Sequence, residues 1–190
     1  MIRNYIFDLV GVIADFGTKR VFQHFIELGA NDVWELNNEM DLGYLSGEEF
    51  LRLVHERCKG TTIEQLRAEY LCPMTLPVEH LELLCQLRKE HRVFLLSNVG
   101  DMHWQHFESA MAQHGYRLDD CFEEVFPSFQ THVNKPDPRA YQNVIEQMRI
   151  DPVETLFFDD APANVEAACR LGIHGQLVKT AFPNPQLLEI

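Results

Sequence analysis

The sequence is poor in positive charge. It has 16 Lys and Arg residues against 29 Asp and Glu residues among 190, which gives a formal net charge of −13 at pH 7. No stretch gathers the basic residues into a cluster. Binding to a phosphate backbone or to an anionic membrane surface requires a positive field. We therefore expect neither nucleic acid nor a membrane as a partner.

Long hydrophobic runs and paired cysteines are also missing. No stretch approaches the ~20 apolar residues that span a bilayer, and Asp8 interrupts the apolar N-terminal run, unlike in a signal peptide. The cysteines are odd in number, contain no Cys-x-x-Cys pair and suit a reducing compartment, so we expect a cytoplasmic protein with buried or partly buried, inert thiols. They are Cys58, Cys72, Cys85, Cys121 and Cys169.

Three short apolar runs each end abruptly in polar residues. They are 4–7 followed by Asp8, 92–96 followed by Ser97 and Asn98, and 155–158 followed by Asp159 and Asp160. Continuous apolar runs indicate strands that are buried on both faces, as in a parallel sheet covered by helices. Helical periodicity lies between the runs, at 77–91, 101–114, 137–148 and 163–171. This alternation predicts an α/β fold with a doubly wound, Rossmann-like parallel sheet.

Residues 17–76 carry no strand pattern but several helix signatures. Ser46-Gly47-Glu48-Glu49 forms a capping box, for example. The segment is too long for an ordinary crossover loop. We therefore predict a small helical-bundle subdomain at 17–76, inserted between two pieces of the core at 1–16 and 77–190. Within it, residues 41–45 have the weakest helical pattern and are a candidate substrate-facing loop.

Ligands of open α/β sheets bind outside the carboxyl ends of the strands. This rule brings Asp8, Asp159 and Asp160 to one edge, together with the neutral donors Ser97 and Asn98. Three carboxylates would repel one another unless a hard cation lay among them, and an oxygen-rich site of this kind suits Mg²⁺. The sequence therefore predicts a magnesium site at this edge.

Lys135 supplies the fixed positive charge that an anionic substrate needs. It stands in Asn134-Lys135-Pro136-Asp137-Pro138, just before a predicted helix N-terminus. A carboxylate nucleophile, a metal, polar donors and a lysine together indicate phosphoryl transfer through a carboxylate.

Four segments in order resemble the motifs of the haloacid dehalogenase superfamily, in the subgroup with a helical cap after the first motif. They are residues 5–12 (YIFDLVGV), 95–98 (LLSN), 135–138 (KPDP) and 157–164 (FFDDAPAN). Each motif alone is a weak signal, but four in order with an insert of cap length are a strong one. The resemblance covers essentially the whole chain and extends to members that act as sugar-1-phosphate phosphatases.

The resemblance implies a nucleophile and a metal site. Asp8 would attack phosphorus and form an aspartyl-phosphate. The backbone carbonyl of Val10 and the carboxylates of Asp8, Asp159 and Asp160 would hold Mg²⁺. Which of the last two coordinates the metal directly stays open.

The resemblance also implies the phosphate contacts. Ser97, Asn98 and Lys135 would bind the transferring phosphoryl oxygens, and Lys135 would offset the charge that opposes attack by a carboxylate on a phosphate. The cap would close over the site, exclude water and read the leaving group.

Val10 departs from the pattern of many phosphatases in this superfamily. They carry a second Asp there, which protonates the leaving alcohol and activates the hydrolytic water, and such help is typically worth ~10²–10⁴-fold in rate. Valine cannot supply it, although the metal contact uses only the main chain. Leaving groups of lower pKa need less protonation, so anomeric and acyl phosphates are chemically reasonable substrates.

We therefore expect a Mg²⁺-dependent phosphatase of small phosphorylated metabolites, with sugar phosphates as one class, and a site at Asp8, Val10, Ser97, Asn98, Lys135, Asp159 and Asp160. Two alternatives stay open. A 2-haloacid dehalogenase would use a similar Asp without metal, but the pair Asp159-Asp160 would repel a substrate carboxylate. A non-catalytic protein that binds phosphorylated metabolites would explain Val10.

Overall fold

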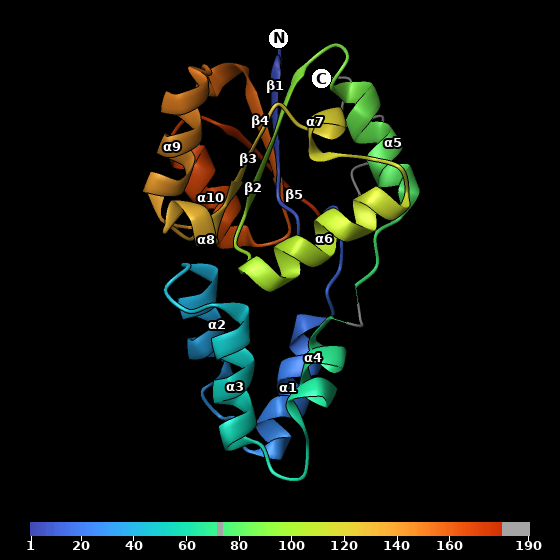
Figure 1. Ribbon diagram of the computed structural model, residues 1–190. Coiled ribbons are helices and arrows are strands. Elements are labelled where there is room, and N and C mark those ends of the chain that lie inside the picture. Colours follow the sequence, from blue (N-terminus) through green and yellow to red (C-terminus); the bar gives the residue numbers. More distant parts are fainter. Residues whose placement is uncertain (72–73, 180–190) are drawn as a thin grey trace.

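The computed structural model describes residues 1–71 and 74–179 and contains a five-stranded, all-parallel sheet (Figure 1). The strands are β1 (Asn4–Phe7), β2 (Arg92–Ser97), β3 (Glu124–Pro127), β4 (Thr155–Asp159) and β5 (His174–Leu177), in the order β3-β2-β1-β4-β5. In β1, Ile6 pairs with Phe94 on one side and with Phe157 on the other. The order reverses at β1, as in a doubly wound sheet, so the predicted fold class is confirmed.

Helices cover both faces of the sheet. One face carries α5 (Val78–Leu87), α6 (Asp101–Gln113) and the short α7 (Leu118–Cys121), and the other carries α9 (Pro138–Met148) and α10 (Pro162–Arg170). Tyr5 and Phe7 of β1 belong to the first hydrophobic cluster, whereas Ile6 belongs to the second. Alternate side chains of the central strand thus enter opposite cores, which explains its continuous apolar run.

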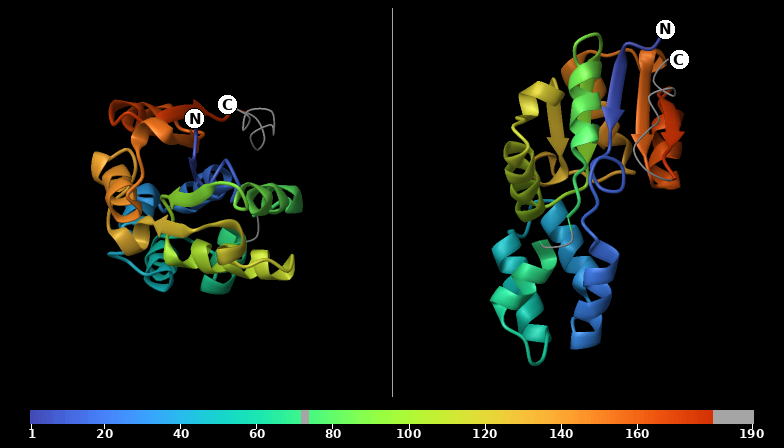
Figure 2. Two further views of the ribbon diagram at one scale, coloured as in Figure 1. Left: turned by 90° about the horizontal axis from the view of Figure 1, so that it is seen from above. Right: turned by 90° about the vertical axis from the view of Figure 1, so that its right-hand side faces the viewer.

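A helical unit lies beyond the carboxyl ends of the strands (Figures 1 and 2). It consists of α1 (Thr18–Leu28), α2 (Val33–Asp41), α3 (Gly47–Arg57) and α4 (Ile63–Leu71), around a hydrophobic cluster of its own. The predicted capping box is present, because Ser46 Oγ accepts from the Glu49 amide and the Glu49 carboxylate accepts from the Ser46 amide. Helix α2 is an element that the sequence pattern did not predict.

The helical unit meets the core at two places. The two linkers run side by side, where Asp15 and Thr75 exchange backbone hydrogen bonds of 3.0 and 2.7 Å. At the second place, the carboxyl end of α2 contacts the short helix α8 (Ser128–Thr131), which follows β3. Here Ser128 Oγ donates to the Asp41 carbonyl and accepts from the Val99 amide. The end of α2 is thereby joined to the loop that follows β2.

His103 of α6 is buried between the core and the helical unit. Its ring stacks on Tyr70 of α4, and Nε2 donates to the Tyr70 carbonyl at 3.1 Å. Burial lowers the pKa of His103 to about 4, although the bond to Tyr70 opposes the shift. Protonation of this imidazole therefore disfavours the folded state.

We expect acid to weaken the fold through His103. Its folded pKa of about 4 lies below the unfolded value of about 6.5, so the unfolded chain takes up the proton first as the pH falls through this window. The free energy of unfolding should fall by up to about 3 kcal/mol more in the wild type than in His103→Gln. Urea unfolding between pH 7 and pH 4 measures this difference, in which the contributions of the carboxylates cancel. Parallel pH profiles would contradict it.

The cysteines of the described residues are free thiols. Cys58 and Cys121 are buried and Cys85 is half-buried, as expected, but Cys169 is exposed. Cys72 lies outside the described residues. None of the helices in the described part of the chain has the length and apolar character that crossing a membrane requires.

Candidate active site

Lys135 joins two carboxylates at the carboxyl edge of the sheet. Its Nζ lies 2.8 Å from Asp8 Oδ1 and 2.7 Å from Asp159 Oδ2. Asp8 directly follows β1, Asp159 ends the adjacent strand β4, and Lys135 precedes α9. The Lys135, Asp8 and Asp159 side chains are 1%, 8% and 0% exposed. Three residues that are distant in sequence thus form one buried ionic group. The strand-end argument predicted that the two aspartates share this edge, but it did not predict their bridge through Lys135.

Asn98 fixes the main chain of Lys135. Its Nδ2 donates to the Lys135 carbonyl and its Oδ1 accepts from the Lys135 amide, both at 2.8 Å. The Lys135–Pro136 peptide is cis. The Asn98 amide therefore contacts the backbone that presents the lysine, a positioning contact that the sequence pattern did not predict.

Ser97 ends β2 with its side chain buried. It is 1% exposed, and its Oγ has no hydrogen-bond partner among the residues that the structure describes. Phe7 pairs with Leu95, so the ends of β1 and β2 place Asp8 and Ser97 at the same edge. A buried, unpaired hydroxyl is costly unless a ligand or water satisfies it. Ser97 is therefore available to a polar ligand at this edge.

Asp159 is held firmly by its surroundings. Its Oδ1 accepts from the Ala161 amide at 2.8 Å, and the Asn164 side chain donates to both carboxylate oxygens at 3.0 and 3.1 Å. With Lys135, these contacts engage both oxygens of Asp159. Asn164 thus supports the loop after β4, and Asp159 orients the lysine.

Asp160 directly follows Asp159 and lies at the same edge of the sheet. The residue is exposed, and its carboxylate lies against Gly11. Gly11 has φ +83°, and a Cβ built there would come within 2.5 Å of Asp160 Oδ2. A side chain at Gly11 would therefore be strained and would also displace Asp160.

The three carboxylates are close enough to share a cation. One oxygen each from Asp8, Asp159 and Asp160 can be chosen so that all lie within 4.8 Å of one another. When ionised, they carry two more negative charges than Lys135 balances. A divalent, oxygen-seeking cation matches both the charge and the donor set.

The pKa values in this group reflect burial and mutual repulsion. Burial is the main cause of a rise in the pKa of Asp8 to about 7; Lys135 opposes this rise and the charge of Asp159 adds to it. Burial also raises the pKa of Asp160, as does Asp159, whereas Lys135 and Lys19 lower it. Burial lowers the pKa of Lys135, but the two carboxylates more than offset this and leave it raised. The lysine is therefore the group that stays charged.

The loop after Asp8 is a tight turn that presents backbone groups. The Leu9 carbonyl accepts from the amides of Ile13 and Ala14, both at 2.9 Å, and the Gly11 amide donates to the Ala14 carbonyl at 2.8 Å. The His80 ring donates from Nδ1 to the Ile13 carbonyl at 2.7 Å. The Val10 carbonyl takes no part in these hydrogen bonds of the turn, and Val10 lies at the wall of the cavity between the core and the helical unit.

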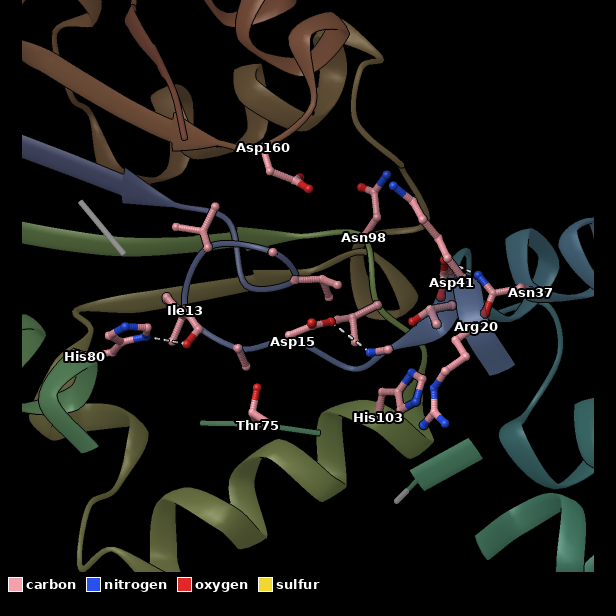
Figure 3. A pocket seen from close by; sticks show the side chains of 18 of the residues that line it. Ile13, Asp15, Arg20, Asn37, Asp41, Thr75, His80, Asn98, His103 and Asp160 are labelled. Atoms are coloured by element: carbon pink, nitrogen blue, oxygen red, sulfur yellow. Dashed lines mark hydrogen bonds between the residues drawn. The ribbon is translucent and has the colours of Figure 1, made fainter. Parts of the chain in front are cut away.

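A cavity of about 710 Å³ lies between this edge and the helical unit. Figure 3 shows Asp160 and Asn98 directed toward each other at the core side of the cavity, with Asn37 and Asp41 of α2 on the side of the helical unit. The helical unit also contributes residues that the sequence pattern did not single out. They are Lys19, Arg20, Trp34 and Asn37. Polar residues on a short helix are usually solvated, so no local signal marked them.

The sequence is similar to a known protein family and to characterised phosphatases. The model of the haloacid dehalogenase-like hydrolase family matches residues 2–172. D-ribitol-5-phosphate phosphatase of Bacteroides thetaiotaomicron is 30% identical over 185 residues, which cover 90% of this chain and 89% of that protein.

Solved structures show the same architecture. A haloacid dehalogenase family enzyme from Bacteroides thetaiotaomicron, in complex with magnesium and inorganic phosphate, superposes with a TM-score of 0.87 at 28% identity, over 100% of both chains. A hydrolase of this type from Porphyromonas gingivalis has a TM-score of 0.75 at 31% identity, over 93% of this chain and 91% of that one. L-2-haloacid dehalogenase from Xanthobacter autotrophicus shares the fold, with a TM-score of 0.63 at 20% identity over 94% of this chain and 78% of that one.

Proposed function

This chain belongs to the haloacid dehalogenase-like hydrolases, and we propose that it is a Mg²⁺-dependent phosphatase of small phosphorylated metabolites that forms an aspartyl-phosphate on Asp8. The observation that carries the proposal is the buried ion bridge from Lys135 to Asp8 and Asp159, beside an open cavity. The relative named as a D-ribitol-5-phosphate phosphatase supports sugar or polyol phosphates as the substrate class.

The donor set at the edge fits Mg²⁺. We propose that Asp8, Asp160 and the Val10 carbonyl contribute direct ligands, because both oxygens of Asp159 already accept hydrogen bonds within the protein. Asp159 then acts on the metal site through its charge and through Lys135. When bound, the cation would neutralise excess negative charge and stabilise the phosphoryl oxygens.

The protein groups divide the chemistry between them. Asp8 attacks phosphorus, the bond from phosphorus to the leaving oxygen breaks, and that oxygen takes up a proton. Lys135 and Ser97 face the phosphoryl oxygens, and Asn98 holds Lys135 in place. Water then hydrolyses the aspartyl-phosphate and frees Asp8.

We propose residues 17–76 as the cap of this enzyme and residues 1–16 and 77–190 as its core. Support comes from the separate hydrophobic cluster of the helical unit and from the linker pair Asp15–Thr75 at its base. The position of the unit across the cavity suits water exclusion during attack by Asp8.

Phosphate release from a panel of sugar, polyol and alkyl phosphates tests the function directly. We expect release that EDTA abolishes and Mg²⁺ restores. Absence of release from every substrate, with a folded protein that binds phosphate mimics tightly, would instead favour a non-catalytic binding protein. Halide release from 2-haloacids that persists in EDTA would favour a dehalogenase.

Asp160→Asn should weaken Mg²⁺ binding by at least about 100-fold, since even outer contacts of metal sites are typically worth 10–100-fold in affinity. The substitution removes a charge at an exposed position, so folding should be unaffected. Calorimetric titration with Mg²⁺ measures the change. Glu146→Gln, on the exposed side of α9, is the matched control and should bind like the wild type. Equal affinity in Asp160→Asn would overturn the ligand assignment.

Val10→Asp should raise turnover of alkyl phosphates by up to about 10²–10⁴-fold, because it supplies a missing general acid. Phosphates with good leaving groups should gain less, since they need less protonation. Steady-state kinetics on a matched alkyl and aryl pair give the comparison. A folded variant without any gain on the alkyl phosphate would show that protonation of the leaving group is not limiting.

A further inference from the structure

Helix α2 brings a hydrogen-bonded polar pair into the cavity. Asn37 and Asp41 lie four residues apart on one helix face, and Asn37 Nδ2 donates to Asp41 Oδ2 at 2.7 Å. Both residues line the cavity, across from Asn98 and Asp160 (Figure 3). A leaving group attached to a phosphoryl at Asp8 would extend into this space.

The position of Asp41 is fixed by contacts of the main chain with the core. Ser128 Oγ donates to the Asp41 carbonyl at 2.5 Å, and His132 Nδ1 donates to the Leu42 carbonyl at 2.7 Å. Gly43 lies so close to the Phe129 carbonyl that a Cβ would come within 2.1 Å of that oxygen. The carboxylate of Asp41 is therefore held beside the edge of the sheet before any ligand binds.

The surroundings of Asp41 disfavour an ionised carboxylate, so the residue is not explained by a contribution to the stability of the fold. It stands at the carboxyl end of α2, where the helix dipole disfavours an anion. Burial raises its pKa to about 7, against hydrogen bonds from Asn37 and from the Gly100 amide. Among the described residues no Lys or Arg forms an ion pair with it.

The charged and titratable groups around Asp41 come from several elements. On α1, Lys19 and Arg20 line the same cavity, as do His103 of α6 and Asp160 of the core. Tyr70 of α4 lies close enough to Asp41 for the charge of the carboxylate to raise the pKa of the Tyr70 hydroxyl. Asp41 is half-buried at the wall of the cavity, and its carboxylate has lone pairs left to accept hydrogen bonds from a ligand.

We propose that Asn37 and Asp41 are specificity determinants that bind hydroxyl groups of the leaving moiety, so that the enzyme selects phosphorylated polyols or sugars over phosphates of apolar alcohols. The inference rests on the proposed phosphatase function. The Asp41 carboxylate accepts from one or two neighbouring hydroxyls, and Asn37 offers its second N–H and its carbonyl. An apolar leaving group would instead cover the carboxylate without pairing it, and sites built for a hydroxyl reject analogues that lack it by up to about 10⁴–10⁵-fold.

The test compares three phosphates: a linear polyol phosphate, an n-alkyl phosphate of equal chain length and p-nitrophenyl phosphate. For the wild type we expect kcat/KM on the polyol phosphate to exceed that on the alkyl phosphate by at least about 100-fold. Asp41→Asn, Asp41→Ala and Asn37→Ala should each reduce this ratio by at least about 10-fold. Glu39→Gln removes a charge from the exposed side of the same helix and should leave the ratio unchanged.

Two results would overturn the inference alone: a wild type that hydrolyses all three phosphates without preference, or variants whose losses are equal on the polyol and alkyl phosphates. If Asp41→Ala fails to fold, the ratio is read from Asp41→Asn and Asn37→Ala. A wild type that hydrolyses none of the three phosphates would overturn the proposed function as well.

Discussion

Asp8→Asn should abolish phosphate release. We expect kcat to fall by at least about 10⁴-fold, because enzymes that lose their nucleophile typically show decreases of this size. An amide cannot attack phosphorus to form the acyl-phosphate bond. The shape of the residue is nearly unchanged, and the bond that the Leu9 amide donates to Oδ1 can be kept. Release of inorganic phosphate with Mg²⁺ present, followed on the best substrate of the panel, measures the loss.

The fold should survive this substitution. Burial raises the pKa of Asp8, so the ionised carboxylate is costly to the folded state and a neutral amide removes that cost. Lys135 keeps Asp159 as its partner. We therefore expect an unfolding temperature in metal-free buffer at least equal to that of the wild type. Equal phosphate release by Asp8→Asn and wild type would refute the assigned nucleophile.

Lys135→Met should be the most destabilising single change at the site. It removes the ammonium that lies between Asp8 and Asp159 and leaves two buried carboxylates without a counter-charge. Breaking a buried ion pair from one side typically costs about 3–5 kcal/mol. Methionine retains most of the aliphatic volume, so the loss reflects charge more than packing. Urea unfolding gives the change in the free energy of unfolding, and phosphate release should fall below detection as well.

Lys135→Met combined with Asp159→Asn is the matched control for the ion bridge. With Lys135 and Asp159 both neutral, only Asp8 remains as a buried carboxylate without a counter-charge. The double variant should therefore regain part of the lost stability but no activity. Added Mg²⁺ should also stabilise the single variant more than the wild type, because it meets a larger excess of negative charge. A loss below about 1 kcal/mol in Lys135→Met would show that the bridge contributes little to the folded state.

The core and the residues at its edge could be predicted from the sequence because the signal is local. A continuous apolar run followed at once by Asp8, or by Asp159 and Asp160, marks both a buried strand and its carboxyl end. Parallel pairing then brings these ends together without further information. Lys135 was also placed at this edge, because it stands just before a predicted helix N-terminus and supplies the positive charge that an anionic substrate needs.

The contacts among these residues could not be predicted in the same way. Both Asp159 and Asp160 follow the same apolar run, and only the turn into α10 decides that Asp159 meets Lys135 while Asp160 meets the cavity. Similarly, a short amide such as Asn98 can reach either a ligand or a nearby main chain. In the folded chain, the loop that contains Lys135 packs against the end of β2, and the Asn98 side chain therefore bonds the main chain of Lys135.

Helix α2 was missed because its sequence, VWELNNEMD, is mostly polar and buries only Val33 and Met40. Its place depends on contacts with Ser128 and His132, which are about ninety residues away in the chain. Periodicity reports on the faces of an element and carries no information on such distant partners. Of the cavity wall that α2 forms, only Asp41 lies in the segment 41–45 that the sequence marked as a substrate-facing candidate; Trp34 and Asn37 become visible only in the three-dimensional structure.

The turn after Asp8 separates two neighbouring positions that have very different freedom to change. In the metal site that we propose, position 10 contributes only a main-chain oxygen, so its side chain can be exchanged without moving a ligand. Residue 11 must remain glycine, because any Cβ at this position would clash with the Asp160 carboxylate. An enzyme built this way can gain or lose a proton donor in a single substitution while its metal ligands stay in place. Residue 10 is accordingly where directed evolution toward poorer leaving groups should begin, with residue 11 held constant in every library.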